Sequence, residues 1–307
     1  MHAKAHSTFK HSTFEEFENI GVGRAVLCVA NGFSFEENVD TIRELQENVD
    51  IMACDKTMGH LLDNGIVPTY VMVCDANVDF ERYMEKWKYQ LEDTILFINV
   101  CANPKWSHNG NWKKIVFFSN RDVLDSHLEF SALSKCPNFI PAGTNVSNAM
   151  VILLTQSDND GRRNLFGYDK LLLIGFDYSW KHGGKYYAFD ESGDGKANYM
   201  RHSYLVAPNG DLVYSSGNLV FSMDWLKTYV SAFRLPVIQC AASSILSFAG
   251  KAANLREQMK YSFKPEDRGP VRSAVKELRA IKAREQELIS KINNIGRDHF
   301  WAQYRTV

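Results

Sequence analysis

The chain has 307 residues, of which 45% are hydrophobic and 23% charged, and its formal net charge is −1. This balance is typical of a globular protein with a full core, and it excludes collagen-like, disordered and small disulfide-stapled chains. No apolar run approaches the roughly 18 residues of a transmembrane helix, and the first residues do not resemble a secretory signal. We therefore expect a cytoplasmic protein without a membrane span.

Short apolar runs alternate with amphipathic stretches along most of the chain. This pattern is typical of βα units, so we expect an α/β, Rossmann-like (GT-A-like) fold with a mostly parallel sheet flanked by helices. Strands are predicted over residues 25–30, 49–54, 70–74, 95–100, 115–118, 170–175 and 236–240. Helices are predicted from near residue 35 and over 56–64, 149–155, 222–233 and 272–294.

Two stretches lack such periodicity. Residues 101–112 are rich in Trp, Asn and His and predict a loop. Residues 178–217 are rich in Gly, Tyr, Asp and Asn and predict a long lid loop, because irregular segments of this length inside compact domains usually carry function.

Charge divides the chain unevenly. Residues 251–307 hold 13 Lys and Arg against 7 Asp and Glu, a net charge of +6. We predict an N-terminal tail over 1–20, a catalytic domain over 21–250 and a basic helical extension over 251–307. The apolar stripe of helix 272–294 packs either on the domain or on a second copy in a homo-oligomer, and the basic surface is either a solvated helix face or a site for an acidic partner.

The six cysteines are scattered, and no two have the spacing of a redox pair or a zinc site. A thiol in an apolar strand behaves as a small hydrophobe. We expect all six to be reduced and to lie in or near the core.

Polar residues follow four of the predicted strands: Asn31-Gly32, Asp55, Asp75 and Asp177. The carboxyl ends of strands border the ligand crevice of an open α/β sheet, so these residues are expected to converge on one site. Asp55 and Asp75 are candidates for a divalent cation such as Mg²⁺ or for a ribose. Each is also compatible with capping of the helix that follows.

Two small-residue turns enter predicted helices, and both are candidates for phosphate binding through backbone N–H groups. The first is Asn31-Gly32 with Ser34, which we expect to cap its helix. The second is Gly143-Thr144-Asn145. Neither turn matches a P-loop or a dinucleotide-binding fingerprint, so the pattern of each turn taken alone favours a purely structural role.

Among the nine histidines, His202 lies within the predicted lid, after the aromatic run that contains Tyr187. An imidazole exchanges protons near neutral pH, so His202 is a candidate general base. A surface loop histidine without a catalytic role fits the pattern as well. Asp177 ends the most apolar strand and opens this same loop, which makes it a catalytic candidate or an anchor for the loop.

Several motifs flank these strands: VANGFSF at 29–35, GIVPTYV at 65–71, GTNV at 143–146, LIGFDY at 173–178, NGDLVY at 209–214 and FSMDWL at 221–226. Over residues 25–250 the chain resembles the motility accessory factor family, which shares its domain with 6-hydroxymethylpterin diphosphokinase. The stretch 175–190 and His202-Ser203 are also similar to small bacterial lipooligosaccharide sialyltransferases.

The sialyltransferase resemblance implies roles for four residues. Asn31 would contact the nucleotide with Thr144 beside it, Tyr187 would hold the leaving phosphate, and His202 would be the catalytic base. Those enzymes carry Asn where this chain has Asp55 and Asp75. Two carboxylates repel a diphosphate unless a cation intervenes, which brings the chain nearer to the Mg²⁺-dependent pterin kinase type.

Three functions follow as hypotheses. The first is a glycosyltransferase that moves a sugar from a nucleotide-activated donor to a hydroxyl of a glycan, a protein or a hydroxylated DNA base. The second is a Mg²⁺-dependent diphosphokinase acting on a pterin-like alcohol; no Lys or Arg phosphate clamp is recognisable near its turns. The third is a nucleic-acid-associated module that uses the basic extension with Trp301 and Tyr304.

Overall fold

The computed structural model describes residues 12–120, 136, 138–141, 143–156, 165–181, 186–189, 202–248, 252–260, 284 and 288. Contacts divide the chain into two units, Met1–Lys264 and Pro265–Val307. Apart from Arg284 and Leu288, the predicted helix 272–294 lies outside the described residues, as do Trp301 and Tyr304. No helix in the described part of the chain is long and apolar enough to cross a membrane.

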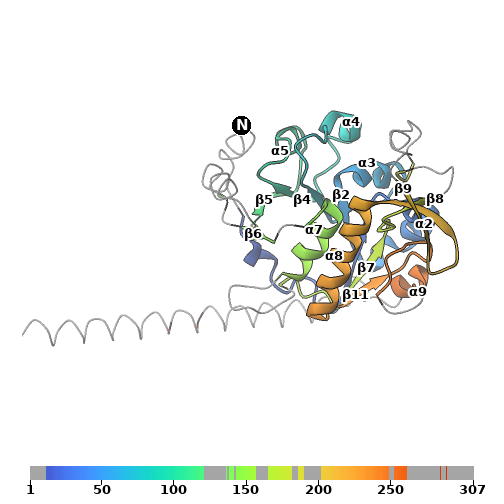
Figure 1. The fold of residues 1–307 in the computed structure, drawn as a ribbon. Coiled ribbons are helices and arrows are strands. Elements are labelled where there is room, and N and C mark those ends of the chain that lie inside the picture. Colours follow the sequence, from blue (N-terminus) through green and yellow to red (C-terminus); the bar gives the residue numbers. More distant parts are fainter. Residues whose placement is uncertain are drawn as a thin grey trace, which may run out of the picture. The chain divides into compact units, whose positions relative to one another are not determined.

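An eight-stranded parallel sheet forms the centre of the first unit, in the order β11-β7-β1-β2-β3-β4-β5-β6 (Figure 1). The strands are β1 Ala25–Val29, β2 Asp50–Cys54, β3 Tyr70–Val73, β4 Ile95–Asn99, β5 Lys114–Asn120, β6 Phe139–Ile140, β7 Lys170–Ile174 and β11 Val237–Gln239. The seven predicted strands are confirmed with ends shifted by at most two residues, and β6 is an addition.

Helices cover both faces of this sheet, because successive strand residues point to opposite sides. In β1, Leu27 and Val29 enter one core with α2, α3, α4, α5 and α9, whereas Val26 and Cys28 enter the other with α7 and α8. Both cores are largely solvent-free, and all six cysteine thiols are free. The helices are α2 Phe33–Leu45, α3 Asp55–Asp63, α4 Phe80–Met84, α5 Lys105–Asn109, α7 Val146–Thr155, α8 Gly217–Phe233 and α9 Leu255–Lys260.

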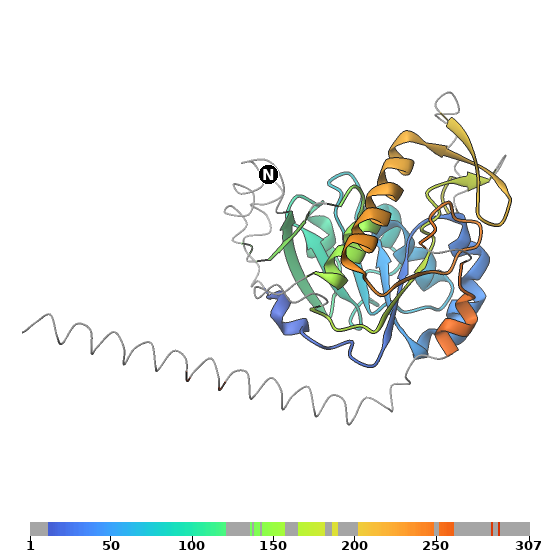
Figure 2. The same ribbon diagram turned by 60° about the horizontal axis from the view of Figure 1, so that its bottom comes forward.

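The prediction of one long loop over 178–217 is wrong in part. A three-stranded antiparallel sheet, β8-β10-β9, occupies its described residues. It consists of β8 Trp180–Lys181, β9 His202–Val206 and β10 Leu212–Ser216. In Figure 2 the β9–β10 hairpin projects from the start of α8, away from the large sheet. The missed signal was two β-prone runs flanking Asn209-Gly210, a dipeptide typical of hairpin turns.

The predicted loop over 101–112 is also wrong in part, because α5 forms inside it. Trp106 on this helix is fully buried and packs edge-on against Phe80 of α4. Its indole N–H donates to the Val78 carbonyl. Tertiary burial of one large ring thus selects a helix that local periodicity does not indicate.

Candidate functional site

A cavity of about 620 Å³ opens where β1 and β7 end. These strands are neighbours in the sheet, but the chain leaves β1 toward β2 on one side and continues from β7 to β11 on the other. Ligands of open α/β sheets bind outside such a switch in strand order. The cavity lining contains eight of the predicted site residues: Asn31, Gly32, Asp55, Asp75, Gly143, Thr144, Asn145 and Tyr187.

Asp177, which follows β7, stabilises the turn between β1 and α2 by a hydrogen bond. One of its carboxylate oxygens accepts a hydrogen bond from the Ser34 N–H at 2.9 Å, and the Ser34 hydroxyl accepts one from the Gly175 N–H at 2.8 Å. A Cβ atom at Gly32 would stand 2.2 Å from the Asp177 carboxylate. Only glycine therefore fits this turn in its present geometry.

The expected capping role of Ser34 is wrong. Helix α2 begins two residues earlier than predicted, with Gly32 as N-cap, and Ser34 lies inside its first turn. Its hydroxyl reaches back to β7 instead of capping the helix. Ser34 is buried and lies outside the cavity lining, so a ligand contact through its side chain stays a prediction.

Asp177 also lies outside the cavity lining, with 1% of its surface exposed. Burial raises the pKa of its carboxyl group to about 7, although the two hydrogen-bonding groups of Ser34 act in the opposite direction. Its second oxygen has no hydrogen-bond partner among the described residues. These contacts favour a structural role for Asp177, and its catalytic role stays a prediction.

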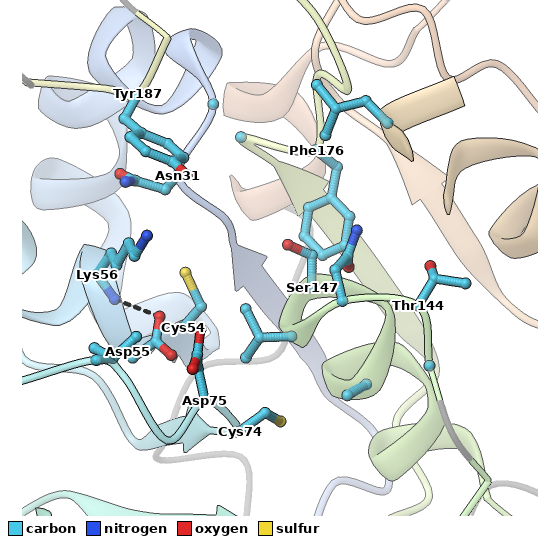
Figure 3. A pocket seen from close by; sticks show the side chains of 18 of the residues that line it. Asn31, Cys54, Asp55, Lys56, Cys74, Asp75, Thr144, Ser147, Phe176 and Tyr187 are labelled. Carbon is cyan, nitrogen blue, oxygen red and sulfur yellow. Dashed lines mark hydrogen bonds between the residues drawn. The ribbon is translucent and has the colours of Figure 1, made fainter. Parts of the chain in front are cut away.

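Asp55 and Asp75 approach each other at the ends of β2 and β3 (Figure 3). Asp55 is buried and begins α3, and one carboxylate oxygen accepts the Lys56 N–H at 2.7 Å. Burial raises the pKa of Asp55 to about 6, and the charge of Asp75 acts in the same direction. Asp75 is exposed, and one of its oxygens accepts the Asn77 N–H at 2.8 Å.

Lys56 is a site residue that sequence reasoning missed. Its side chain is half-buried in the cavity wall, and Nζ stands 4.6 Å from the ring centre of Tyr187. Burial opposes the charge, but Tyr187, Tyr83 and Asp55 raise the pKa of the amine above its ordinary value. A lysine directly after a strand-end aspartate, at a helix start, was the available signal.

Tyr187 belongs to a segment, residues 186–189, that the structure fastens to α2 and α3. The Ala188 N–H donates to the Asn31 carbonyl at 3.0 Å, and the Phe189 ring packs against Phe35 and His60. Figure 3 shows the Tyr187 ring beside Asn31, on the side of the cavity that carries Lys56, Asp55 and Asp75. We call this side the charged wall. The Asn31 side-chain oxygen is buried and has no partner in the described part of the chain.

The opposite wall is built by the start of α7. Asn145 caps this helix by accepting the Asn148 N–H at 2.9 Å. The Asn148 amide in turn donates to the Thr144 hydroxyl at 2.8 Å and to the Ser222 carbonyl of α8. Thr144, Ser147 and Phe176 line this side of the cavity (Figure 3), which carries no charged side chain among the described lining residues.

His202 is placed only through its backbone. It is the first residue of β9 and pairs in register with Ser216 of β10. Ser216 is the N-cap of α8, and Leu219 of that helix lines the cavity. The strand register thus brings the backbone of His202 to the α8 side of the site, and its role as a base stays a prediction.

Comparison with known proteins places the chain in a family. The family model described as 6-hydroxymethylpterin diphosphokinase MptE-like matches residues 2–183. The chain belongs to this MptE-like family. The match covers both strand-end aspartates, the α7 turn and Asp177, but not His202 or Tyr187. No curated protein sequence matches the chain.

Solved structures share the fold of this MptE-like protein. One of them is the MAf glycosyltransferase from Magnetospirillum magneticum AMB-1, with a TM-score of 0.56 and 15% sequence identity. The alignment covers 86% of this chain and 39% of that structure, so the chain spans about two fifths of its neighbour. The Rossmann-like fold class and the resemblance to motility accessory factors are thereby confirmed.

Proposed function

We propose that this MptE-like protein is a glycosyltransferase that binds a nucleotide-activated sugar in the β1–β7 cavity and transfers the sugar to an acceptor hydroxyl. The observation that carries the proposal is the convergence of Asn31, Thr144, Asp55 and Tyr187, from four separate segments, on one cavity at the switch in strand order. The volume of about 620 Å³ lies within the range of small-molecule sites.

Each wall of the cavity suits a different part of such a donor. The charged wall, with Lys56, Tyr187 and the start of α3, suits the phosphate, and the uncharged wall, with Thr144 and Phe176, suits the nucleoside. Hydroxyl and amide groups orient a ligand, and an aromatic ring provides an apolar contact for a base. This arrangement agrees with the nucleotide contacts that the sequence resemblance assigns to Asn31 and Thr144.

The transfer would proceed by direct substitution. The acceptor oxygen forms a bond to the anomeric carbon while the bond from that carbon to the phosphate oxygen breaks. The Tyr187 hydroxyl donates a hydrogen bond to the departing phosphate, and His202 takes the proton of the acceptor. The acceptor classes are those expected from the sequence: a glycan, a protein or a hydroxylated base.

The first test is a titration of the protein with CMP-, UDP- and GDP-sugars, followed by a transfer assay with the donor that binds best. We expect binding of one nucleotide class in the micromolar range. His202→Gln should lower turnover by about 10²- to 10⁴-fold with little change in donor affinity, whereas the control His108→Gln, on α5, should retain full activity. Failure of every donor to bind contradicts the proposal.

A diphosphokinase acting on a pterin-like alcohol is the second candidate, favoured by the adjacent carboxylates of Asp55 and Asp75. Mg²⁺ is commonly held by one or two carboxylates together with substrate phosphates, so this pair fits the ion. The described residues contain no cluster of three or more His, Cys, Asp or Glu that would hold a metal unaided. When bound with ATP, Mg²⁺ would neutralise phosphate charge during transfer.

Lys56 supports this second candidate, because it is a cation in the cavity lining, and no Lys or Arg phosphate clamp is recognisable in the sequence near the turns. Formation of AMP from ATP in the presence of 6-hydroxymethylpterin and Mg²⁺ would establish it. Asp55→Asn and Asp75→Asn should each abolish that reaction, and the exposed Asp63→Asn, outside the cavity, should not. Sugar transfer without AMP formation decides for the glycosyltransferase.

A further inference from the structure

Lys56 holds a distinctive position among the charged groups of the cavity. Of the described residues that line it, Lys56 alone is a cation, and Asp55 and Asp75 are the acids. In Figure 3 its amine extends from the start of α3 toward the Tyr187 ring, away from the backbone N–H that Asp55 accepts. The amine therefore faces the space between the charged wall and Asn31.

The contacts of this amine differ from those of the other lysines that rest on aromatic rings. Lys86, Lys88, Lys114 and Lys181 each stand within 5.8 Å of a ring centre and also pair with a carboxylate. Within the described part of the chain, the Lys56 amine interacts with the Tyr187 side chain, over its ring and by a hydrogen bond, and has no ion pair. The Lys56 amine is thus partly desolvated and has no carboxylate in contact, although the charge of Asp55 acts on it, so the amine can pair with a bound anion.

Three helices start at the same cavity and add to this positive potential. They are α2, α3 and α7, whose N-cap residues Gly32, Cys54 and Asn145 all belong to the lining. The N-terminal end of a helix carries a partial positive charge that favours a bound anion. Lys56 is the second residue of α3, so its amine and the end of that helix act on the same region.

We propose that Lys56 forms a phosphate-binding subsite at the start of α3, where its amine pairs with the donor phosphate that departs in the reaction. This inference rests on the proposed function and deepens it, because it assigns a phosphate-recognising cation to the charged wall. The phosphate takes the place of the Tyr187 ring as the main partner of the amine. Tyr187 then stands next to the same phosphate, where its hydroxyl can donate.

The test compares charge and bulk at this position. Wild-type protein, Lys56→Met and Lys56→Arg are titrated with CMP, UDP, GDP and ADP and with the corresponding nucleosides, with Mg²⁺ and with EDTA. Lys86→Met is the matched control, because Lys86 also rests on a ring, that of Trp87, but is exposed outside the cavity. Inorganic pyrophosphate serves as a probe without a base.

Loss of a charged hydrogen bond should weaken nucleotide and pyrophosphate binding to Lys56→Met by about tenfold or more. Nucleoside binding should stay unchanged, and Lys56→Arg should bind nucleotide within about threefold of wild type because it keeps the charge. Lys86→Met should match wild type throughout. The circular dichroism spectrum and thermal unfolding of each variant establish that it is folded, and if Lys56→Met does not fold, Lys56→Gln replaces it.

Three results would overturn the inference. If the wild type binds a nucleotide and Lys56→Met binds it equally well, the subsite is wrong while the proposed function stands. An equal loss for nucleoside and nucleotide assigns Lys56 to packing instead of phosphate recognition. If the wild type binds none of the nucleotides with or without Mg²⁺, the proposed function itself fails.

Discussion

The two ends of the parallel sheet both bury carboxylates, but they surround them with different partners. At the amino ends, Arg24 pairs with Asp50, and the Tyr168 hydroxyl donates to the same carboxylate at 2.8 Å. The Tyr70 hydroxyl bonds to that of Tyr168 at 3.0 Å, which extends the network, while the buried Nε of Arg24 has no partner in the described part of the chain. The charge of this carboxylate is thus matched by a cation and a donor in the interior.

At the carboxyl ends, Asp55 and Asp177 are equally buried, yet each accepts hydrogen bonds from backbone N–H groups and has no ion pair among the described residues. Burial raises the pKa of both. Unmatched polar groups of this kind cost stability and concentrate at functional sites. The comparison separates an amino end whose buried carboxylate is paired with a cation from a carboxyl end whose buried carboxylates lack one, and the proposed ligand site lies at the carboxyl end.

The largest effect is expected from a substitution at the amino ends of the strands. Arg24→Met leaves the Asp50 carboxylate buried without its cation, and removing one partner of a buried ion pair costs about 3–5 kcal/mol. Urea unfolding should show this loss, while nucleotide affinity of the folded variant stays at the wild-type value. The exposed pair of Arg256 and Glu44 is the control, and Arg256→Met should cost at most about 1 kcal/mol. A small loss in Arg24→Met would remove the contrast between the two ends.

The next effect tests the geometry of the ligand end. Gly175 has a φ of +73°, and a Cβ atom there would stand 1.9 Å from the Ala30 carbonyl oxygen. Gly175→Ala should lower the free energy of unfolding by about 3 kcal/mol and weaken nucleotide binding. Gly210 has a φ of +91° with no atom within 4 Å of an added Cβ. Gly210→Ala should therefore cost only the backbone strain, about 1–2 kcal/mol, and leave binding intact.

The third effect is a pH dependence of the free energy of unfolding. An Asp whose pKa is about 7 in the folded state and 3.8 when unfolded stabilises the fold fully below pH 4, and this contribution disappears as the pH rises to 7. Asp177→Asn keeps an acceptor for the Ser34 N–H and removes the titration. Its stability relative to wild type should rise by at most about 1.4 kcal/mol per pH unit between pH 4 and 7 and then level off.

Urea unfolding at pH 5, 6, 7 and 8 measures this difference. The charged neighbours Glu37 and Lys181 oppose each other at Asp177, so burial sets the sign of the shift. Asp55→Asn is a parallel case whose window ends near pH 6. A stability difference between Asp177→Asn and wild type that is independent of pH would show that Asp177 is ionised in the folded protein throughout this range.

Much of the large sheet could be predicted from the sequence, because its strands are continuous apolar runs that end in Asn31, Asp55, Asp75 and Asp177. The strand order could not, since hydrophobic pattern does not tell which strands are neighbours. The strand order determines which of these residues reach the cavity. It places Asn31, Asp55 and Asp75 in one cavity, whereas Asp177 turns back beneath the Gly32 turn and holds Ser34.

Lys56 and the small sheet were missed for different physical reasons. A lysine in the first turn of a helix usually faces solvent, and only the packing of residues 186–189 across α2 and α3 encloses Lys56. The strands β9 and β10 have a recognisable hairpin pattern, but the glycine-rich composition of the surrounding residues favours the prediction of a loop. For Lys56, the deciding contacts join residues more than a hundred positions apart in the sequence. For β9 and β10, the deciding pattern is short and local.

A crystal structure of the protein with the nucleotide that binds best tests the central claim most directly. The account predicts that the nucleotide lies in the β1–β7 cavity, with a phosphate oxygen within hydrogen-bonding distance of the Lys56 amine and the base against the Thr144 and Phe176 wall. A nucleotide bound elsewhere on the protein, or bound in the cavity with its phosphates turned away from α3, would contradict it.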